Sequence, residues 1–416
     1  MKNQDSKSNR VWVVTELFAP DDAATAHLLT QIAEHLATQQ SVSVVCAQPT
    51  YTNRGQKAKS RETTNGVDIY RCWSTTFSKD SLPLRLVNIV TIMISFFCCM
   101  LLRFRRNDTV LVVTNPPTLP FATQLAAWLR GCKTCLLVHD IYPNVLVPTG
   151  FTKEKSIPYR IIDFFNRQLF RRVDHIITLG RDMKNLVEQK DESLSAKTSI
   201  VPNWADESLK PVCAEANKIR DELQFGGKFV IQYSGNIGRT HGLSVIARAA
   251  EILERKGVDD IHWMVCGWGG GKSKFQDLCE SLELKTISIH EPYPRERLAE
   301  LIGVADVSII SFIVGMAGIS VPSRMYNVLA CGCPIIGVTE EHSELALTIS
   351  DDNLGWVVEP GNETALAELV ESLLQQRSSL SDYQDRCQLV SQQKFARNIS
   401  LQSYGEIISQ IARSEN

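Results

Sequence analysis

Short, nearly continuous apolar runs alternate with helical patterns along the first half of the chain. Such runs begin at residues 11, 41, 109, 134 and 175. The stretches between them space their apolar residues as amphipathic helices do, over 26–39, 119–130, 158–171 and 181–189. Strands that are apolar on both faces and joined by helices are typical of a parallel sheet covered on both sides. The pattern therefore predicts a doubly wound α/β domain over residues 1–200.

The alternation pauses over residues 198–226 and then resumes. Further apolar runs begin at residues 229, 261, 287, 307 and 334, with helical patterns over 242–256, 272–283, 294–303, 322–331 and beyond 362. We therefore expect a second Rossmann-like domain over 201–394, followed by a C-terminal helix at 395–416 that packs back on the first domain. Two such domains would leave a ligand-binding cleft between the carboxyl ends of their sheets.

Residues 86–102 do not fit the soluble pattern. These seventeen residues contain no charge, and Arg103, Arg105 and Arg106 follow them. Three interpretations stay open: a buried helix, a helix inserted into the membrane surface, and a spanning helix, although a span needs about 20 residues. For the membrane-surface interpretation, charged substitutions at Phe96 and Phe97 would release the protein from membranes.

The two halves of the chain differ in charge. Residues 1–200 carry 25 Lys or Arg and 17 Asp or Glu, whereas residues 201–416 carry 19 and 29. This asymmetry argues against a uniform nucleic-acid binder and favours contact of the first half with anionic lipid. The twelve cysteines show no disulfide spacing or zinc-finger pairs, and the polar first ten residues do not form a signal peptide. We expect a cytoplasmic protein, peripheral at the inner face of the plasma membrane.

Two segments of the second half carry candidate chemistry. The turn over 234–242 follows a strand and opens a helix, and its glycines and amides suit a phosphate. We expect Arg239 and His241 to add positive charge there, although a Gly-rich turn can serve only to turn the chain. In the second segment Arg324 lies at a helix start, which is unfavourable against the macrodipole unless an anion binds there. We therefore predict a diphosphate site, with Tyr326 and Asn327 within reach of a ribose or sugar hydroxyl.

Several short motifs follow one another in a family-specific order. They are Phe18-Ala-Pro20, Thr114-Asn-Pro-Pro117, His139-Asp-Ile-Tyr-Pro-Asn144, Val201-Pro-Asn203, Gly235-Asn-Ile-Gly238, Val265-Cys-Gly267 and Pro322-Ser-Arg-Met-Tyr326. With this series the chain resembles a retaining glycosyltransferase of the family-four type, which has the GT-B fold. It is similar to the bacterial fucosaminyl and related aminosugar transferases that build surface polysaccharides on a lipid carrier.

The chain departs from that family at three places. Asp21 to Thr25 replace a pair of glycines, and His241 stands where a lysine is usual. The family's Glu-x7-Glu pair is absent, and its second position is Asn327.

The resemblance implies transfer of a sugar from a nucleotide-diphosphate sugar to a lipid-linked or other glycan acceptor, with retention of configuration, in polysaccharide or cell-envelope biosynthesis. It implies no metal and no further cofactor. The residues expected to act in catalysis are His139, Asp140 and Arg324. Those expected at the donor are Gly235, Asn236, Gly238, Arg239, His241, Gly267, Ser323, Tyr326, Asn327 and Glu344. Those expected at the acceptor are Phe18, Thr25 and Asn115.

Structural roles stay open for some of these residues. His139 could only bond backbone at its strand end, and Asp140 could only cap a turn. Two other functions also stay open: a non-catalytic nucleotide-sugar-binding protein, suggested by the missing Glu pair, and a nucleotide-sugar 2-epimerase, which also has twin Rossmann domains.

Overall fold

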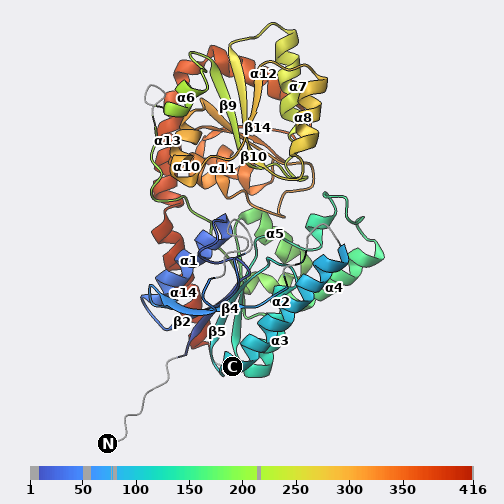
Figure 1. The fold of residues 1–416 in the computed structure, drawn as a ribbon, viewed down its shortest axis with the longest axis vertical. Coiled ribbons are helices and arrows are strands. Elements are labelled where there is room, and N and C mark those ends of the chain that lie inside the picture. The colour runs from blue at the N-terminus through green and yellow to red at the C-terminus, as the bar shows by residue number, and fades with distance from the viewer. Residues whose placement is uncertain (1–8, 50–57, 76, 78–81, 213–216, 415–416) are drawn as a thin grey trace, which may run out of the picture. The chain divides into compact units, whose positions relative to one another are not determined.

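Two separate sheets, one mostly and one wholly parallel and each covered by helices, organise the chain (Figure 1). The structure is a computed structural model that describes residues 9–49, 58–75, 77, 82–212 and 217–414. The N-terminal unit comprises Met1–Pro143, Lys155–Pro202 and Asn398–Asn416, and the C-terminal unit comprises Asn144–Glu154 and Asn203–Arg397. The predicted α/β class with two Rossmann-like domains is confirmed.

The sheet of the N-terminal unit has the strand order β3-β4-β2-β1-β5-β6-β7-β8. Its strands are β1 (Val11–Val14), β2 (Val42–Ala47), β3 (Arg61–Thr64), β4 (Val67–Cys72), β5 (Thr109–Val113), β6 (Lys133–Leu137), β7 (His175–Thr178) and β8 (Thr198–Ile200). Every neighbouring pair is parallel except β3 with β4. The residues of β1, β2, β5 and β6 are all buried, as their continuous apolar runs predict.

In the part of this unit that the structure describes, the helices are α1 (Ala24–Ala37), α2 (Leu82–Arg103), α3 (Leu119–Arg130), α4 (Ile157–Arg172), α5 (Arg181–Lys190) and α14 (Arg397–Arg413). The last of them is tied to the N-terminal unit at two points. Ser400 Oγ donates to the Pro202 carbonyl at 2.8 Å, and Lys133 Nζ donates to Ser414 Oγ at 2.9 Å. Within the described part of the chain, no helix has both the length and the apolar character needed to cross a bilayer.

The sheet of the C-terminal unit is parallel throughout, in the order β11-β10-β9-β12-β13-β14. Its strands are β9 (Phe229–Asn236), β10 (Ile261–Trp268), β11 (Ile287–His290), β12 (Val307–Ser311), β13 (Ile335–Val338) and β14 (Gly355–Val358). Its helices are α6 (Lys218–Glu222), α7 (Ser244–Arg255), α8 (Lys272–Ser281), α9 (Leu298–Gly303), α10 (Arg324–Ala330), α11 (Glu344–Asp352), α12 (Glu363–Gln375) and α13 (Leu380–Lys394). Among the described residues of this unit, the largest fully buried side chains are Trp263, Tyr233 and Tyr326, at 1%, 0% and 1% exposure.

The sequence pattern missed five elements: β3, β4, β8, β14 and α11. In β4 the buried Val67 and Ile69 alternate with the half-buried Asp68 and Tyr70, so the strand shows no continuous apolar run. Helix α11 begins with an N-cap that the apolar pattern does not reveal: Ser343 Oγ accepts from the Ala346 amide at 3.1 Å. The predicted helix at 322–331 is shorter than expected, since α10 begins at Arg324.

Candidate functional site

The ends of β9 and β10 approach each other so closely that only glycine fits. Gly235 and Gly267 are register partners, with φ of 142° and 157°. A Cβ atom on Gly267 would lie 1.9 Å from the Gly235 carbonyl oxygen. Both backbones adopt a conformation that side chains disfavour, so glycine is the residue that suits both positions. This is the geometry that a Gly-rich phosphate-binding turn needs.

Arg324 packs directly against this turn. Its Nη1 donates to the Ser234 carbonyl at 3.2 Å, and its guanidinium lies over the Tyr233 ring at 4.6 Å. A Cβ on Gly235 would be 3.0 Å from that Nη1, so a side chain at position 235 would displace the arginine. The structure thus brings together the two segments in which the sequence predicted a diphosphate site, and it places a half-buried cation where they meet.

His241 does not supply the second positive charge that the sequence led us to expect. Burial, together with the charge of Arg324, lowers the pKa of its imidazole to about 3. The ring stacks on Phe312 at 5.7 Å and meets the Tyr233 ring edge-on at 6.4 Å. The expectation of a cationic His241 is therefore wrong: at neutral pH the side chain is an uncharged member of an aromatic cluster beside Arg324.

The remaining residues of the turn are more open. Asn236 and Arg239 are exposed and Gly238 is half-buried. The Arg239 guanidinium lies over the ring of Phe151 at 5.5 Å, within the same unit. Arg239 can therefore add the positive charge at the turn that His241 does not.

The residues at α10 and α11 that were predicted to bind the donor differ in burial and in hydrogen bonding. Tyr326 is 1% exposed and packs edge-on against Phe395, so placing its ring at a sugar hydroxyl was wrong: it is a core side chain. Asn327 Oδ1 accepts from the Asp206 amide at 3.2 Å. Ser323 precedes α10 without a side-chain cap bond, and Glu344 starts α11 and accepts from Thr348 Oγ1 at 3.2 Å.

In the N-terminal unit, predicted residues gather at the carboxyl ends of the adjacent strands β5 and β6. Thr114 Oγ1 accepts from the amides of His139 and Asp140 at 2.9 and 3.3 Å. Burial lowers the pKa of His139 to about 4, so its imidazole is neutral at pH 7. Burial, together with the Asp140 carboxylate, raises the pKa of Tyr142 to about 12. Asn115, after β5, is exposed.

The prediction that Phe18 and Thr25, after β1, contact the acceptor agrees only in part with the burial of their side chains. Thr25 is half-buried in the first turn of α1, but Phe18 is only 4% exposed. The ring of Phe18 is therefore part of the core, which corrects its assignment as an acceptor contact. Arg71 fixes the chain beside it, because its Nη2 donates to the Ala19 carbonyl at 2.7 Å and its Nη1 pairs with Glu62 at 2.6 Å.

Sequence reasoning did not single out several neighbours of the site. Tyr233 supports Arg324, Phe312 stacks on His241, and Glu340 accepts from the amides of Gly315 and Ala317 at 3.1 and 3.0 Å. The role of an aromatic residue at the end of a strand cannot be recognised from the sequence, because such residues are also common in the core.

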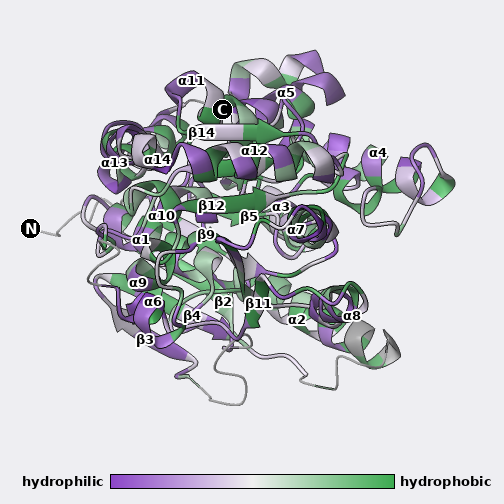
Figure 2. Cartoon of the chain, turned by 90° about the horizontal axis from the view of Figure 1, so that it is seen from above, coloured by the Kyte–Doolittle hydropathy of each residue, from purple (hydrophilic) through white to green (hydrophobic). Residues whose placement is uncertain are grey.

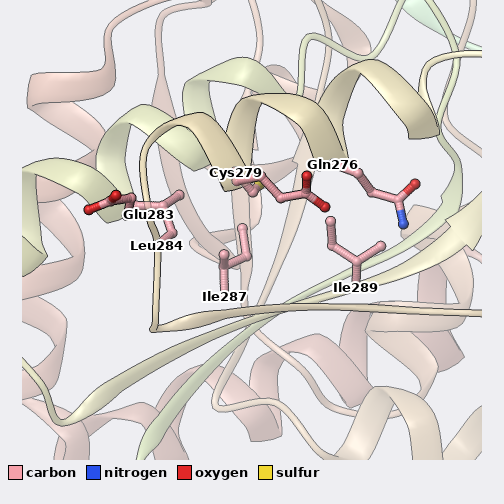
Figure 3. Close-up of a pocket in the computed structure, with 7 residues that line it drawn as sticks. Gln276, Cys279, Glu283, Leu284, Ile287 and Ile289 are labelled. Atoms are coloured by element: carbon pink, nitrogen blue, oxygen red, sulfur yellow. The ribbon is translucent and has the colours of Figure 1, made fainter.

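Cavities open at two places on the described part of the C-terminal unit that bear on the site. One of about 510 Å³ adjoins the Gly-rich turn and is lined by Gly242, Arg248, Phe312 and Glu363 among others. The other, of about 250 Å³, lies between α8 and β11, where Gln276 and Cys279 face Ile287 and Ile289 (Figure 3). Burial raises the pKa of the Cys279 thiol to about 11, so this groove presents no reactive group. Among the described residues, no cluster of three or more His, Cys, Asp or Glu side chains could hold a metal ion.

The lowered pKa values of His139 and His241 predict a pH dependence of stability. Because each imidazole binds its proton at a lower pH in the folded chain than in the unfolded one, the free energy of unfolding should fall as the pH drops below about 6.5. For one histidine this amounts to about 2 kcal/mol between pH 6.5 and pH 5. Denaturant unfolding at these two pH values should show a smaller difference for His241→Gln than for the unsubstituted protein. An unchanged difference would show that the imidazole titrates normally.

The paired doubly wound units and the arginine-backed Gly-rich turn define the chain as a protein of the GT-B glycosyltransferase class. Residues 24–204 match the family described as glycosyl transferase 4-like domain, and residues 215–389 match the family described as glycosyl transferases group 1. The chain belongs to this family of glycosyltransferases. This assignment confirms the transferase prediction over the epimerase and the non-catalytic binding protein.

Similar proteins are found in bacteria. The chain is 30% identical to the probable glycosyltransferase WbjE of Pseudomonas aeruginosa, over 74% of this chain and 75% of that one. It is 26% identical to the putative colanic acid biosynthesis glycosyl transferase WcaI of Escherichia coli K12, over 86% and 90%. The solved structure of Anabaena HepE in complex with UDP-glucose has the same fold, with a TM-score of 0.73, 12% identity, and coverage of 96% of this chain and 99% of that one.

Proposed function

We propose that the chain transfers a sugar from a nucleotide-diphosphate sugar to a lipid-linked glycan acceptor, with retention of anomeric configuration, in polysaccharide or cell-envelope biosynthesis. The observation that carries the proposal is the position of Arg324 against the Gly235 turn. The nucleotide sugar in the structure of Anabaena HepE, which has the same fold, supports the choice of donor. The name of the Escherichia coli relative supports the polysaccharide pathway.

The chemistry of the proposed donor site is electrostatic. Negative charge develops on the leaving diphosphate as the glycosidic bond breaks, so a fixed cation and backbone amides aimed at it lower the barrier. Arg324 suits this role because Tyr233 and the Ser234 carbonyl hold its guanidinium in place. We further propose that the diphosphate is held without a metal ion.

On the acceptor side we propose His139 and Asp140, next to Asn115 and Thr25. In a front-face transfer the leaving phosphate can take the acceptor proton, so no strong side-chain base is needed. A neutral His139 fits such a reaction, since it can position the acceptor hydroxyl by hydrogen bonding without carrying charge. We place the protein in the cytoplasm, at the inner face of the plasma membrane, where a lipid-linked acceptor would be presented.

A donor screen tests the proposal. The purified chain is heated with UDP-, GDP- and dTDP-sugars in turn, and the true donor should stabilise it by about 2.7 kcal/mol at a hundredfold excess over Kd. The stabilising sugar is then supplied in labelled form with a lipid-linked acceptor, and the anomeric configuration of the product is read by NMR. Product of inverted configuration would overturn the retaining mechanism, and binding without any transfer would overturn the proposed reaction.

Chelation tests the metal-free diphosphate site. Transfer should continue at an unchanged rate after dialysis against EDTA, because the cation of the site is Arg324. A loss of activity that added Mg²⁺ or Mn²⁺ restores would show that a metal ion holds the diphosphate.

A further inference from the structure

Two neighbouring helices of the N-terminal unit expose stripes of large apolar side chains. On α3, Trp128 and Leu129 are 72% and 52% exposed. On α4, Phe164 and Phe165 are 57% and 55% exposed and continue a stripe that begins at Ile157 and passes through Ile161, one or two turns apart. Green, hydrophobic segments recur among purple ones along α4 in Figure 2.

Helix α2 packs against α3, which in turn packs against α4, and α2 is apolar on both its sides. Ile92, Phe96 and Met100 face the core, at 8%, 0% and 0% exposure, whereas Val90 and Ile94 on the opposite side are 54% and 58% exposed. The earlier choice of Phe96 as a membrane contact is therefore wrong. A helix that is apolar on both sides is normally covered on both sides, but here Val90 and Ile94 are left exposed.

The charges around these helices are almost all positive. Residues 82–130, which span α2 and α3, hold five Arg and a single acidic residue, Asp108, and α4 adds four Arg and Asp163, which pairs with Arg167. Asp108 is buried and bonds Trp12 and the Arg105 amide, so it does not neutralise the surface. The side chains of Arg105, Arg106 and Arg130 are exposed at the C-terminal ends of α2 and α3.

We infer that the exposed face of α2, α3 and α4, here called the apolar face, docks on the surface of an anionic lipid bilayer. The inference rests on the proposed function, which needs access to a lipid-linked acceptor, and adds the surface that provides it. Trp and Phe side chains insert at the boundary between headgroups and acyl chains, and arginines beside them bind lipid phosphates. The positive charge also argues against pairing with a second copy of the chain, since two such faces would repel each other.

Vesicle flotation tests the apolar face. The full chain is mixed with vesicles of phosphatidylethanolamine and phosphatidylglycerol, and in parallel with vesicles of phosphatidylcholine alone. We expect binding to the anionic vesicles and weak binding to the neutral ones. The triple variant Trp128→Ser, Phe164→Ser, Phe165→Ser should bind the anionic vesicles more than about tenfold less tightly. Replacing Arg105 and Arg106 by Gln should weaken binding about fivefold for each charge removed.

The matched control is the double variant Leu389→Ser, Ile399→Ser, which removes side chains that are 50% and 43% exposed on α13 and α14. It should bind vesicles like the unsubstituted chain. Because all these side chains are exposed, the variants should keep the thermal midpoint of the unsubstituted chain. If the triple variant unfolds, the single variant Trp128→Phe takes its place. Quenching of tryptophan fluorescence by brominated lipid then reports insertion, and Trp128→Phe should lose that quenching.

Equal vesicle binding by the triple variant and the unsubstituted chain would overturn the inference. So would a chain that ignores anionic vesicles but forms dimers that the triple variant abolishes. The proposed function is read separately, from donor-induced stabilisation and transfer to a water-soluble acceptor, in which the triple variant should match the unsubstituted chain. Docking without transfer would overturn the function alone, and transfer without docking would overturn the apolar face alone.

Discussion

Replacing Arg324 by Ala should lower the turnover of sugar transfer about a hundredfold, because the leaving diphosphate loses its fixed cation. Arg324 is held at the turn by the Ser234 carbonyl and the Tyr233 ring, so neither solvent nor a neighbouring lysine can replace its charge in the same position. Arg324→Lys should recover only part of the rate, since an ammonium lacks the planar fork that binds two phosphate oxygens. The measurement is kcat with the donor found in the screen.

Arg386 provides a matched control for this prediction. It lies over the Tyr383 ring at 4.4 Å, and its Nε donates to the Asn353 carbonyl at 2.9 Å, so its contacts resemble those of Arg324 on another part of the same unit. Arg386→Ala should lose a comparable small amount of stability and keep full turnover. If both variants lose activity equally, the effect of Arg324 is structural, and the diphosphate site must be sought elsewhere.

Replacing Gly267 by Ala should destabilise the C-terminal unit by about 3 kcal/mol and abolish donor binding. The new Cβ would lie 1.9 Å from the Gly235 carbonyl oxygen, so β10 or β9 must shift. Its φ of 157° adds strain for any residue with a side chain. Denaturant unfolding measures the first effect, and the donor-induced shift of the thermal midpoint measures the second.

Gly270, three residues further along the chain in the turn that follows β10, is the control. No heavy atom lies within 4 Å of the place that its Cβ would take. Gly270→Ala should therefore change neither the free energy of unfolding nor the thermal shift with donor. Equal losses in the two variants would mean that the loop tolerates no side chain at all, and a harmless Gly267→Ala would mean that the two strand ends do not lie as close as described.

Together these experiments separate the two roles of the Gly-rich turn. The glycines set the backbone geometry, and their loss should disturb folding as well as binding. Arg324 supplies charge, and its loss should disturb the reaction far more than the fold. A site that served only to turn the chain would show the first effect without the second.

The sequence alone determined the class of fold and the family. Continuous apolar runs specify buried parallel strands whatever their surroundings, so the central strands of both sheets could be found from periodicity. The half-exposed strands β3, β4 and β14 could not, because their pairing depends on a neighbouring strand that the local pattern does not reveal. The pairing of Arg324 with the Gly235 turn followed from two separate motifs, each weak by itself.

Only the tertiary structure decided which side chains face the core and which of them carry a charge. The sequence predicted that Tyr326 and Phe18 contact ligands, but both side chains are buried. It predicted a positively charged His241, but the imidazole is neutral. Burial and charge state are set by atoms far away in the chain, such as the Phe395 ring against Tyr326 and the Arg324 guanidinium near His241. For the same physical reason the sequence located an apolar helix near residues 86–102, but only the packing of α2 on the core showed which of its side chains stay exposed.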